Sequence, residues 1–412
     1  MHVSAIRAIF NRYIAAKYQS PLKDVGDISE KFDEQVTMDG SIINIKPHNF
    51  IFITREGCKD PGARVRCYGY AERVKTLGLD ARVFSLVDNI GAKSGMGDAQ
   101  FTLGEKLKCS YRALRILLNE ERSSVFIVSR FNYHAISAWL VSMVKNIPFI
   151  FDMDDWEARE RPGSIAEHLT RVLARRSVFC IAGSRYLKEY LLQFNKKVYY
   201  IPTAVDTDIF KPSPHIEKED FIFSWHGSVN RIEIIEYLKF IIECFLSLYE
   251  KCPVIKLHIA GDGIFGKELI RLIENYKCDK IIYSGWLDCD SIPLYLDNVD
   301  CGLVPLLDKT RFNLSKSPVK LFEYMAKEKP VVASNVGEAD FIIKDGYNGF
   351  LAASKNEFVA KMEQIVKNKV LAADMGVNAR KTIEKEYSLS ALSEKVADIL
   401  QNFFSYNVDF LK

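Results

Sequence analysis

The stretch KSPVKLFEYMAKEKPVVAS, residues 316–334, decides the fold of this chain of 412 residues. Ser317 and Pro318 predict a helix start, because a hydroxyl can cap free N–H groups and proline loses no hydrogen bond at the first helical position. Apolar spacing extends the helix to Lys327, and residues 331–333 are typical of a buried parallel strand. This is one helix–strand unit of an α/β protein.

The polar residues of this unit suit a nucleotide. Exposed amides and the helix dipole favour a phosphate at the helix start, where Lys320 adds charge. Glu323, one turn later, suits the hydroxyls of a ribose. An ordinary helix–strand unit with a surface glutamate remains the alternative from spacing alone.

The segment SPVKLFEYMAKEKPVVASNVGEADFIIKDGYNGFL closely resembles the donor site of the family 4 glycosyltransferases, which are retaining enzymes with the GT-B fold. The similarity continues over most of the chain, in the order that the family shows. The other matching segments are IPTAVDTDIF (201–210), FSWHGS (223–228), IAGDG (259–263), SGWL (284–287) and DCGLVPL (300–306). Several matches in register are far more specific than any one of them.

The resemblance implies an α/β chain of the GT-B class, with two Rossmann-like, doubly wound domains facing across a cleft. We expect an N-terminal extension (1–48), an acceptor-binding domain (49–205), a linker (206–218) and a donor-binding domain (219–391), with residues 392–412 packing back on the first domain. Short apolar runs alternate with helical patterns and predict the strands. They are 50–54, 81–86, 125–129, 148–151, 180–183 and 199–201, then 221–225, 257–260, 281–283, 301–304 and 331–333.

Composition agrees with two globular domains, since 48% of the residues are hydrophobic. The longest apolar run, 135–144, is too short to cross a bilayer. The first twenty residues lack a signal-peptide pattern, and the nine cysteines show neither CxxC nor CxxH spacing. We therefore expect a cytoplasmic protein with reduced thiols.

The net positive charge of the chain lies in its first half. Residues 1–205 carry 30 Lys and Arg against 22 Asp and Glu, a net charge of +8. Two interpretations stay open, a solvated helical face or contact with an anionic membrane surface or lipid diphosphate on the inner face of the membrane. Nucleic acid is not an expected partner, since no DNA or RNA module is present. The basic residues concerned are Arg7, Arg12, Lys17, Arg159, Arg161, Arg171, Arg175 and Arg176.

The resemblance also assigns residues to the donor. Glu323 matches the family's ribose-binding glutamate, whereas Ser315 stands where the family usually has a second glutamate for the sugar. Lys320 and Arg231 are the predicted catalytic cations that stabilise the leaving diphosphate, with Lys316 as a further substitute for a missing basic partner. Close backbone approach is expected at Gly227, and the helix start at Ser317, with the amides of Val319 and Lys320, is expected to bind the donor. A nucleobase loop is expected at Gly285, Trp286 and Leu287, where Trp286 either stacks on the base or belongs to the core.

On the acceptor side, Arg64 and Arg66 follow the first strand, where open α/β sheets bind ligands. Asp152, Asp154 and Asp155 end a later strand in the motif FDMDDWE. Acceptor contact, helix capping and a divalent metal are three readings of the DxDD pattern, and the resemblance favours the first and no metal. His134 follows a strand, where it either positions sugar or acceptor, as a catalytic residue, or is structural.

The predicted function is thus metal-independent transfer of a hexose-type sugar to a glycan or lipid-linked acceptor, for cell-surface polysaccharide or glycolipid synthesis. The nucleotide-diphosphate sugar is the co-substrate and no separate cofactor is expected. Two alternatives remain, a non-catalytic nucleotide-sugar-binding scaffold, suggested by Ser315, and a GT-B nucleotide-sugar epimerase.

Overall fold

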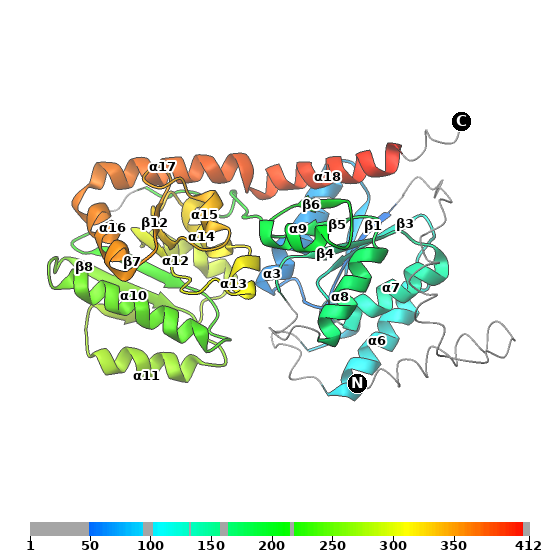
Figure 1. The fold of residues 1–412 in the computed structure, drawn as a ribbon, viewed down its shortest axis with the longest axis horizontal. Coiled ribbons are helices and arrows are strands. Elements are labelled where there is room, and N and C mark those ends of the chain that lie inside the picture. The colour runs from blue at the N-terminus through cyan, green and yellow to red at the C-terminus, as the bar shows by residue number, and fades with distance from the viewer. Residues whose placement is uncertain (1–48, 94–101, 132, 157–163, 215–217, 407–412) are drawn as a thin grey trace, which may run out of the picture.

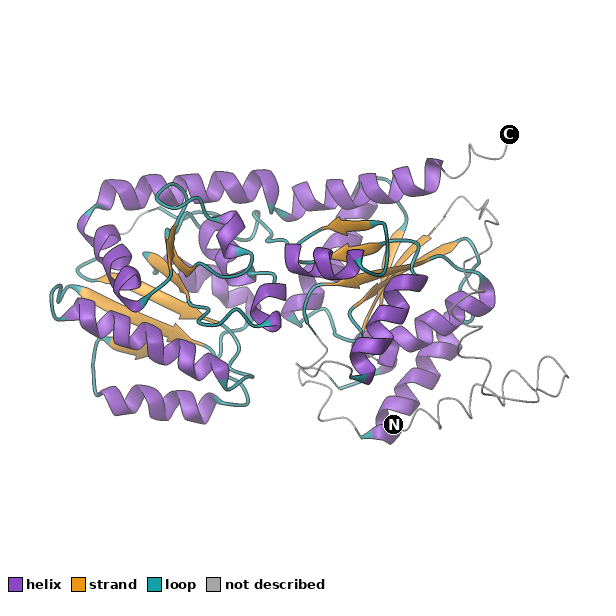
Figure 2. Ribbon diagram, viewed as in Figure 1, coloured by secondary structure: helices purple, strands orange, loops and turns teal. Residues whose placement is uncertain are grey.

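The computed structural model describes residues 49–93, 102–131, 133–156, 164–214 and 218–406. It contains two parallel β-sheets of six strands each, arranged side by side with helices on both faces (Figures 1 and 2). The predicted α/β class with two doubly wound sheets is confirmed. The N-terminal extension, Arg159 and Arg161 lie outside the described residues.

The first sheet has the strand order β2-β1-β3-β4-β5-β6. All six predicted strands of this half are present, with boundaries that move by one or two residues. All six are short. The four inner strands are almost wholly buried, because helices cover both faces of a parallel sheet, whereas the edge strands β2 and β6 are partly exposed. The strands are β1 (Asn49–Thr54), β2 (Ala81–Ser85), β3 (Ser124–Ser129), β4 (Phe149–Met153), β5 (Cys180–Ala182) and β6 (Val198–Tyr200).

Helices connect the consecutive strands of this sheet, as in the crossover units of parallel sheets. The segment after β1 is one continuous helical stretch whose middle turn is a π-helix. The apolar run 135–144 lies within one of these helices, which spans Tyr133–Lys145. The helices are α3 (Pro61–Ala63), η1 (Arg64–Gly69), α4 (Tyr70–Thr76), α5 (Leu86–Ile90), α6 (Leu103–Leu117), α7 (Tyr133–Lys145), α8 (Ile165–Arg176) and α9 (Arg185–Leu192).

The second sheet has the order β12-β11-β10-β7-β8-β9. Its strands are β7 (Phe221–His226), β8 (Ile255–Ala260), β9 (Ile281–Tyr283), β10 (Cys301–Val304), β11 (Val331–Ser334) and β12 (Phe350–Ala352). Five of them were predicted. The edge strand β12 was missed because three residues between a turn and a helix carry too little periodicity.

The helices of this half are α10 (Glu233–Tyr249), α11 (Gly266–Tyr276), η3 (Cys289–Ser291), α12 (Ile292–Asp297), α13 (Arg311–Ser315), α14 (Val319–Ala326), α15 (Ala339–Ile342), α16 (Lys355–Lys367), α17 (Lys369–Glu386) and α18 (Leu389–Tyr406). Helix α17 runs over the second sheet, and α18 continues over the first (Figure 1). Leu392, Val396 and Leu400 of α18 join the core beneath Phe50 and Phe52 of β1. The last helix therefore ties the two halves together.

The carboxyl ends of both sheets point toward the junction between the halves. The residues that follow the strands meet there in pairs, one from each half. Three such contacts run along the junction, Arg64 with Asp290, Trp156 with Ser315, and Arg185 with Glu338. An α/β sheet binds its ligands at this edge, so the junction is where the site must be sought.

Candidate active site

Glu323 lies on α14 and is buried. Its carboxylate oxygen is 2.7 Å from Nε2 of His226, the last residue of β7. The Nδ1 atom of His226 is 2.9 Å from the Tyr324 hydroxyl, which in turn donates to the Ser224 carbonyl. Because this chain of hydrogen bonds is rooted in the backbone, it fixes the orientation of the carboxylate. His226 was not predicted, although its place at the end of the first strand of this half is the signal that could have found it.

Glycines bring the backbone close to the space beside Glu323. Gly227 has a φ of +148° and Gly261 a φ of +151°, values that side chains seldom adopt. A Cβ on Gly261 would stand 2.0 Å from the Gly227 carbonyl oxygen, and one on Gly227 would stand 2.8 Å from Nζ of Lys320. The two strand ends thus require glycine for packing, and Gly227 places its backbone against the lysine.

Lys320 lies over the ring of Trp225, with Nζ 4.0 Å from the ring centroid. Burial, with a smaller effect from Lys316, lowers the pKa of Lys320 to about 7. An incoming anion would restore the ammonium form, because an opposite charge favours it. Lys320 is therefore suited to a ligand that brings negative charge.

The Arg231 and Lys316 side chains both lie over the ring of Phe312. The Arg231 guanidinium is 3.9 Å from the ring centroid of Phe312, and Nζ of Lys316 is 4.8 Å from it. Arg231 also pairs with Glu233 at 3.0 Å. The structure brings the three predicted cations of this half, Arg231, Lys316 and Lys320, into one neighbourhood. Phe312, which holds two of them, was not predicted.

Ser315, Ser317 and Val319 use their polar groups within the protein. The buried Ser315 hydroxyl donates to the Phe312 carbonyl and accepts from the Trp156 amide of the other half. Val319 donates its N–H to the Ser317 carbonyl. The expected helix cap at Ser317 is wrong, since its hydroxyl accepts from the Thr203 amide and α14 begins at Val319 without a side-chain cap.

The predicted nucleobase loop follows β9. Gly285 has a φ of +65° and accepts a hydrogen bond from the Gly261 amide, so the loop is tied to the end of β8. Trp286 is 52% exposed, which rules out the core reading. Leu287 beside it is partly buried. An exposed indole at this edge is available to a planar ligand.

Arg66 does not face the cleft. It is 1% exposed and donates through Nε to Asp152 at 2.8 Å, with a second contact from its terminal nitrogen. Burial alone would lower the pKa of Arg66, but Asp152 and Asp154 raise it. The expectation that Arg66 contacts an acceptor is wrong, because its guanidinium forms a buried ion pair with Asp152.

Asp154 is likewise paired, with its carboxylate 2.5 Å from Nε of Arg130. The same arginine lies 3.3 Å from Asp155 and 3.5 Å from Glu56. Burial raises the pKa of Asp155 to about 6, while Arg130 and Lys316 of the other half act against that rise. Asp155 is therefore the carboxylate of this group that faces the cations across the junction. Within the described residues, no three His, Cys, Asp or Glu side chains are grouped to bind one metal ion.

His134 is buried, and its Nε2 atom lies 2.9 Å from the Ser129 carbonyl. Burial lowers its pKa to about 3, so the ring is neutral. No partner for Nδ1 lies among the residues that the structure describes. His134 therefore contacts the last residue of β3. A pKa this low does not suit a residue that transfers protons near neutral pH.

Arg64 stays at the junction, where its guanidinium is 3.8 Å from Asp290. Both Arg64 and Glu323 lie close enough to Cys289 to influence the pKa of its thiol, which burial raises. Arg64 is thus the acceptor-side arginine that the structure places near the predicted ribose site.

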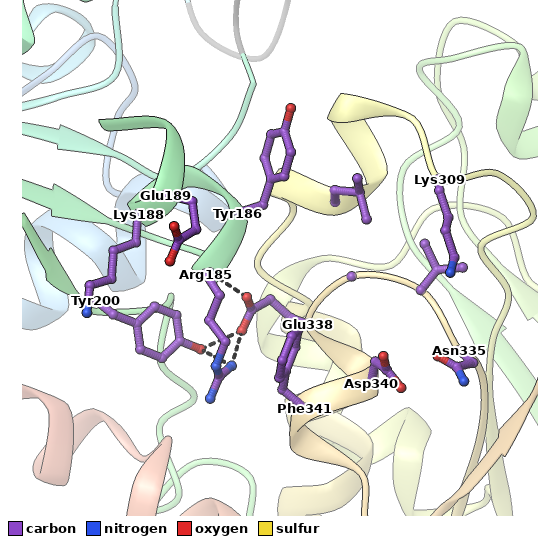
Figure 3. Close-up of a pocket in the computed structure, with 13 residues that line it drawn as sticks. Arg185, Tyr186, Lys188, Glu189, Tyr200, Lys309, Asn335, Glu338, Asp340 and Phe341 are labelled. Atoms are coloured by element: carbon purple, nitrogen blue, oxygen red, sulfur yellow. Dashed lines mark hydrogen bonds and ion pairs between the residues drawn. The ribbon is translucent and has the colours of Figure 1, made fainter. Parts of the chain in front are cut away.

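A pocket of about 600 Å³ opens at the other end of the junction (Figure 3). Glu338 stands between the halves there and accepts hydrogen bonds at 2.6 Å from the Arg185 amide, the Arg185 guanidinium and the Tyr200 hydroxyl. Sequence reasoning missed this cluster, because its members are 138 and 153 residues apart.

Comparison with known proteins agrees with this geometry. Residues 206–382 match the family model "Glycosyl transferases group 1". The fold also matches solved glycosyltransferases of the GT-B class. Residues 206–382 are therefore similar to the group 1 glycosyltransferases, and the chain shares the GT-B fold of the solved enzymes.

Among curated relatives, the poly(ribitol-phosphate) alpha-N-acetylglucosaminyltransferase of Staphylococcus aureus (strain COL) is 26% identical over 190 residues, 44% of this chain and 35% of that protein. The trehalose synthase of Thermococcus litoralis is 36% identical over 172 residues, 40% of each chain. The alignments therefore span well under half the length of these relatives.

Among solved structures, Anabaena Alr3699/HepE in complex with UDP and glucose has a TM-score of 0.65 and 16% identity, covering 85% of this chain and 99% of its own. The sucrose-phosphate synthase of Thermosynechococcus elongatus has a TM-score of 0.71 and 14% identity, covering 87% and 100%. At these identities the likeness establishes the fold.

Proposed function

We propose that this protein transfers a sugar from a nucleotide-diphosphate sugar to a glycan or lipid-linked acceptor, with retention of anomeric configuration. The observation that carries the proposal is Glu323, held by His226 beside Lys320 and the Gly227 turn. A fixed carboxylate suits a ribose diol, and the adjacent cation suits a diphosphate. The arrangement lies in the segment that matches the group 1 model.

The chemical demand is to stabilise the leaving group. Breaking the anomeric C–O bond leaves negative charge on the diphosphate, and preorganised donors in a water-poor site lower the barrier for that step. Lys320, Lys316 and Arg231 supply the charge. No enzyme nucleophile is needed if the leaving phosphate takes the acceptor proton on the same face, and we propose that no metal or separate cofactor takes part.

Cell-surface polysaccharide or glycolipid synthesis is the proposed setting. The curated relatives include a UDP-Gal:alpha-D-GlcNAc-diphosphoundecaprenol alpha-1,3-galactosyltransferase of Escherichia coli and the putative colanic acid biosynthesis glycosyltransferase WcaL of Salmonella typhimurium. We propose a cytoplasmic enzyme, and in the described part of the chain no helix combines the length and apolarity needed to span a bilayer. Arg64 and Asp155 are the proposed acceptor-side residues.

A thermal-shift panel of UDP-, GDP- and ADP-sugars tests the donor site. Wild-type protein should be stabilised by one nucleotide class, and Glu323→Ala should lose most of that shift. Lys267→Ala, on the exposed side of α11, is the matched control and should keep it. Absence of a shift with every nucleotide sugar would refute the proposal.

One observation favours a second function, binding without transfer. The position where the family usually has a sugar-binding glutamate holds Ser315, whose hydroxyl is occupied by Trp156 and Phe312. The two functions are separated by measuring whether the protein releases nucleotide from the nucleotide sugar that stabilises it in the thermal-shift panel. Turnover that Glu323→Ala abolishes supports a transferase, whereas tight binding with no release supports a scaffold.

A further inference from the structure

Helix α6 carries an exposed row of large apolar side chains, which we name the α6 surface. Leu103, Leu107 and Tyr111 are 52%, 44% and 61% exposed. Because they are four residues apart, they lie along one stripe of the helix. The adjoining side of α6 packs inward through the buried Ala113 and Leu117, which belong to the core of the N-terminal half. Leu103, Leu107 and Tyr111 are not part of that core cluster.

The apolar area continues beyond the end of α6. Leu118 follows the helix, and Met143 and Val144 lie in the last turn of α7; all three are also exposed. Lys145 donates to the Leu118 carbonyl at 2.8 Å, which places the two helix ends side by side. Single exposed apolar residues are common, whereas several on adjoining elements indicate an interaction surface.

Cations flank the apolar stripe. Helical spacing places Lys108, Arg112 and Arg115 next to it on the exposed side of α6. Among the residues that the structure describes, none of the three has an ion-pair partner. The acidic residue of the helix, Glu105, is occupied by Lys93 at 2.9 Å and by the Thr102 cap. The surface is thus apolar along one line and positive beside it.

We infer that the α6 surface binds the surface of an anionic lipid bilayer. An amphipathic helix with leucine and an aromatic residue on one side and Lys or Arg beside them suits the boundary between acyl chains and headgroups. Cations near an anionic leaflet add to the binding. A second copy of the chain fits less well, because a symmetric contact would bring the same cations against each other.

The position of α6 in the fold agrees with this occupant. Helix α6 lies at the edge of the N-terminal half opposite α18 (Figure 1). Docking through α6 leaves α18 and the contacts that join the two halves undisturbed. The inference concerns attachment and does not depend on which sugar, if any, the protein transfers.

The experiment is co-sedimentation of the full chain with vesicles of phosphatidylglycerol and phosphatidylcholine, compared with vesicles of phosphatidylcholine alone. Wild-type protein should bind the anionic vesicles. The variant Leu107→Ser/Tyr111→Ser should bind about 100-fold more weakly, from about tenfold per side chain. Arg112→Gln/Arg115→Gln should bind about 25-fold more weakly, from about fivefold per charge, and less so at high salt.

The control is Leu294→Ser/Val370→Ser, which removes two apolar side chains of the other half that are even more exposed, at 71% and 73%. It should bind like the wild type, and all variants should keep the wild-type Tm because the positions are exposed. Failure of the wild type to bind anionic vesicles would overturn the inference, as would binding that both α6 variants retain. Concentration-dependent dimers that Leu107→Ser/Tyr111→Ser abolishes, without vesicle binding, would assign the surface to a second copy instead.

Discussion

The two walls of the junction are built from the same fold but use their charges differently. On the N-terminal side, Arg66 and Arg130 are bound by aspartates of their own wall. On the C-terminal side, Lys316 and Lys320 lie against aromatic rings, and no aspartate or glutamate is within ion-pair distance of them among the described residues. A cation held by a ring still attracts an anion, whereas one held by a carboxylate is already neutralised. The comparison teaches that cations after similar strands are neutralised by carboxylates on one wall and lie against aromatic rings on the other.

The largest effect is expected from breaking the buried pair of the N-terminal wall. Arg66→Met leaves Asp152 buried without its partner, and we expect a loss of about 3–5 kcal/mol in the free energy of unfolding. Urea denaturation measures it. Arg82→Met, which removes an exposed partner of Glu120, should cost about 1 kcal/mol or less. Equal effects of the two variants would contradict the assignment of Arg66 to structure.

On the C-terminal wall, Lys320→Met should leave stability nearly unchanged and reduce donor turnover by about 10²- to 10³-fold, the usual effect of losing one preorganised donor. Nucleotide release from the stabilising donor is the measurement. If Lys320→Met leaves turnover unchanged while Lys316→Met abolishes it, Lys316 rather than Lys320 is the cation that stabilises the leaving diphosphate.

The hydrogen bond that orients Glu323 should matter less than the charge. His226→Asn should weaken nucleotide binding by about tenfold, since a hydrogen bond to a charged group is worth about 1.5–3 kcal/mol and asparagine restores part of it. Calorimetric titration of the nucleoside diphosphate gives the affinity. A purely structural histidine would instead lower the Tm and leave the affinity of the folded protein unchanged.

The smallest expected effect is on pH dependence. The pKa of Lys320 is about 7 in the free protein, so the ammonium form that a diphosphate requires is present below pH 7 and lost above it. Nucleotide affinity should therefore fall by about fivefold between pH 7 and pH 8. Lys320→Arg should remove this dependence, because arginine stays charged. A wild-type affinity that is flat over this range would show that Lys320 does not contact the diphosphate.

Much of the fold could be predicted because buried parallel strands are short apolar runs, such as residues 50–54 and 301–304, between helical patterns. The strand β12 escaped because a three-residue edge strand has no such pattern. Within the site, Lys316, Lys320 and Glu323 share one segment, so their neighbourhood follows from local geometry. His226 and Phe312 could not be assigned in this way, since their roles depend on contacts with residues distant in sequence.

The sequence by itself determined the α/β class, the two sheets and the segment that carries Glu323, because apolar periodicity and helix signals are local. Only the tertiary structure decided which charges are free to act. Arg66 and Arg64 are two residues apart, yet one is buried against Asp152 and the other stays at the junction. That difference depends on which strand ends the fold brings together. The sequence around one residue does not show which distant residue will be its partner.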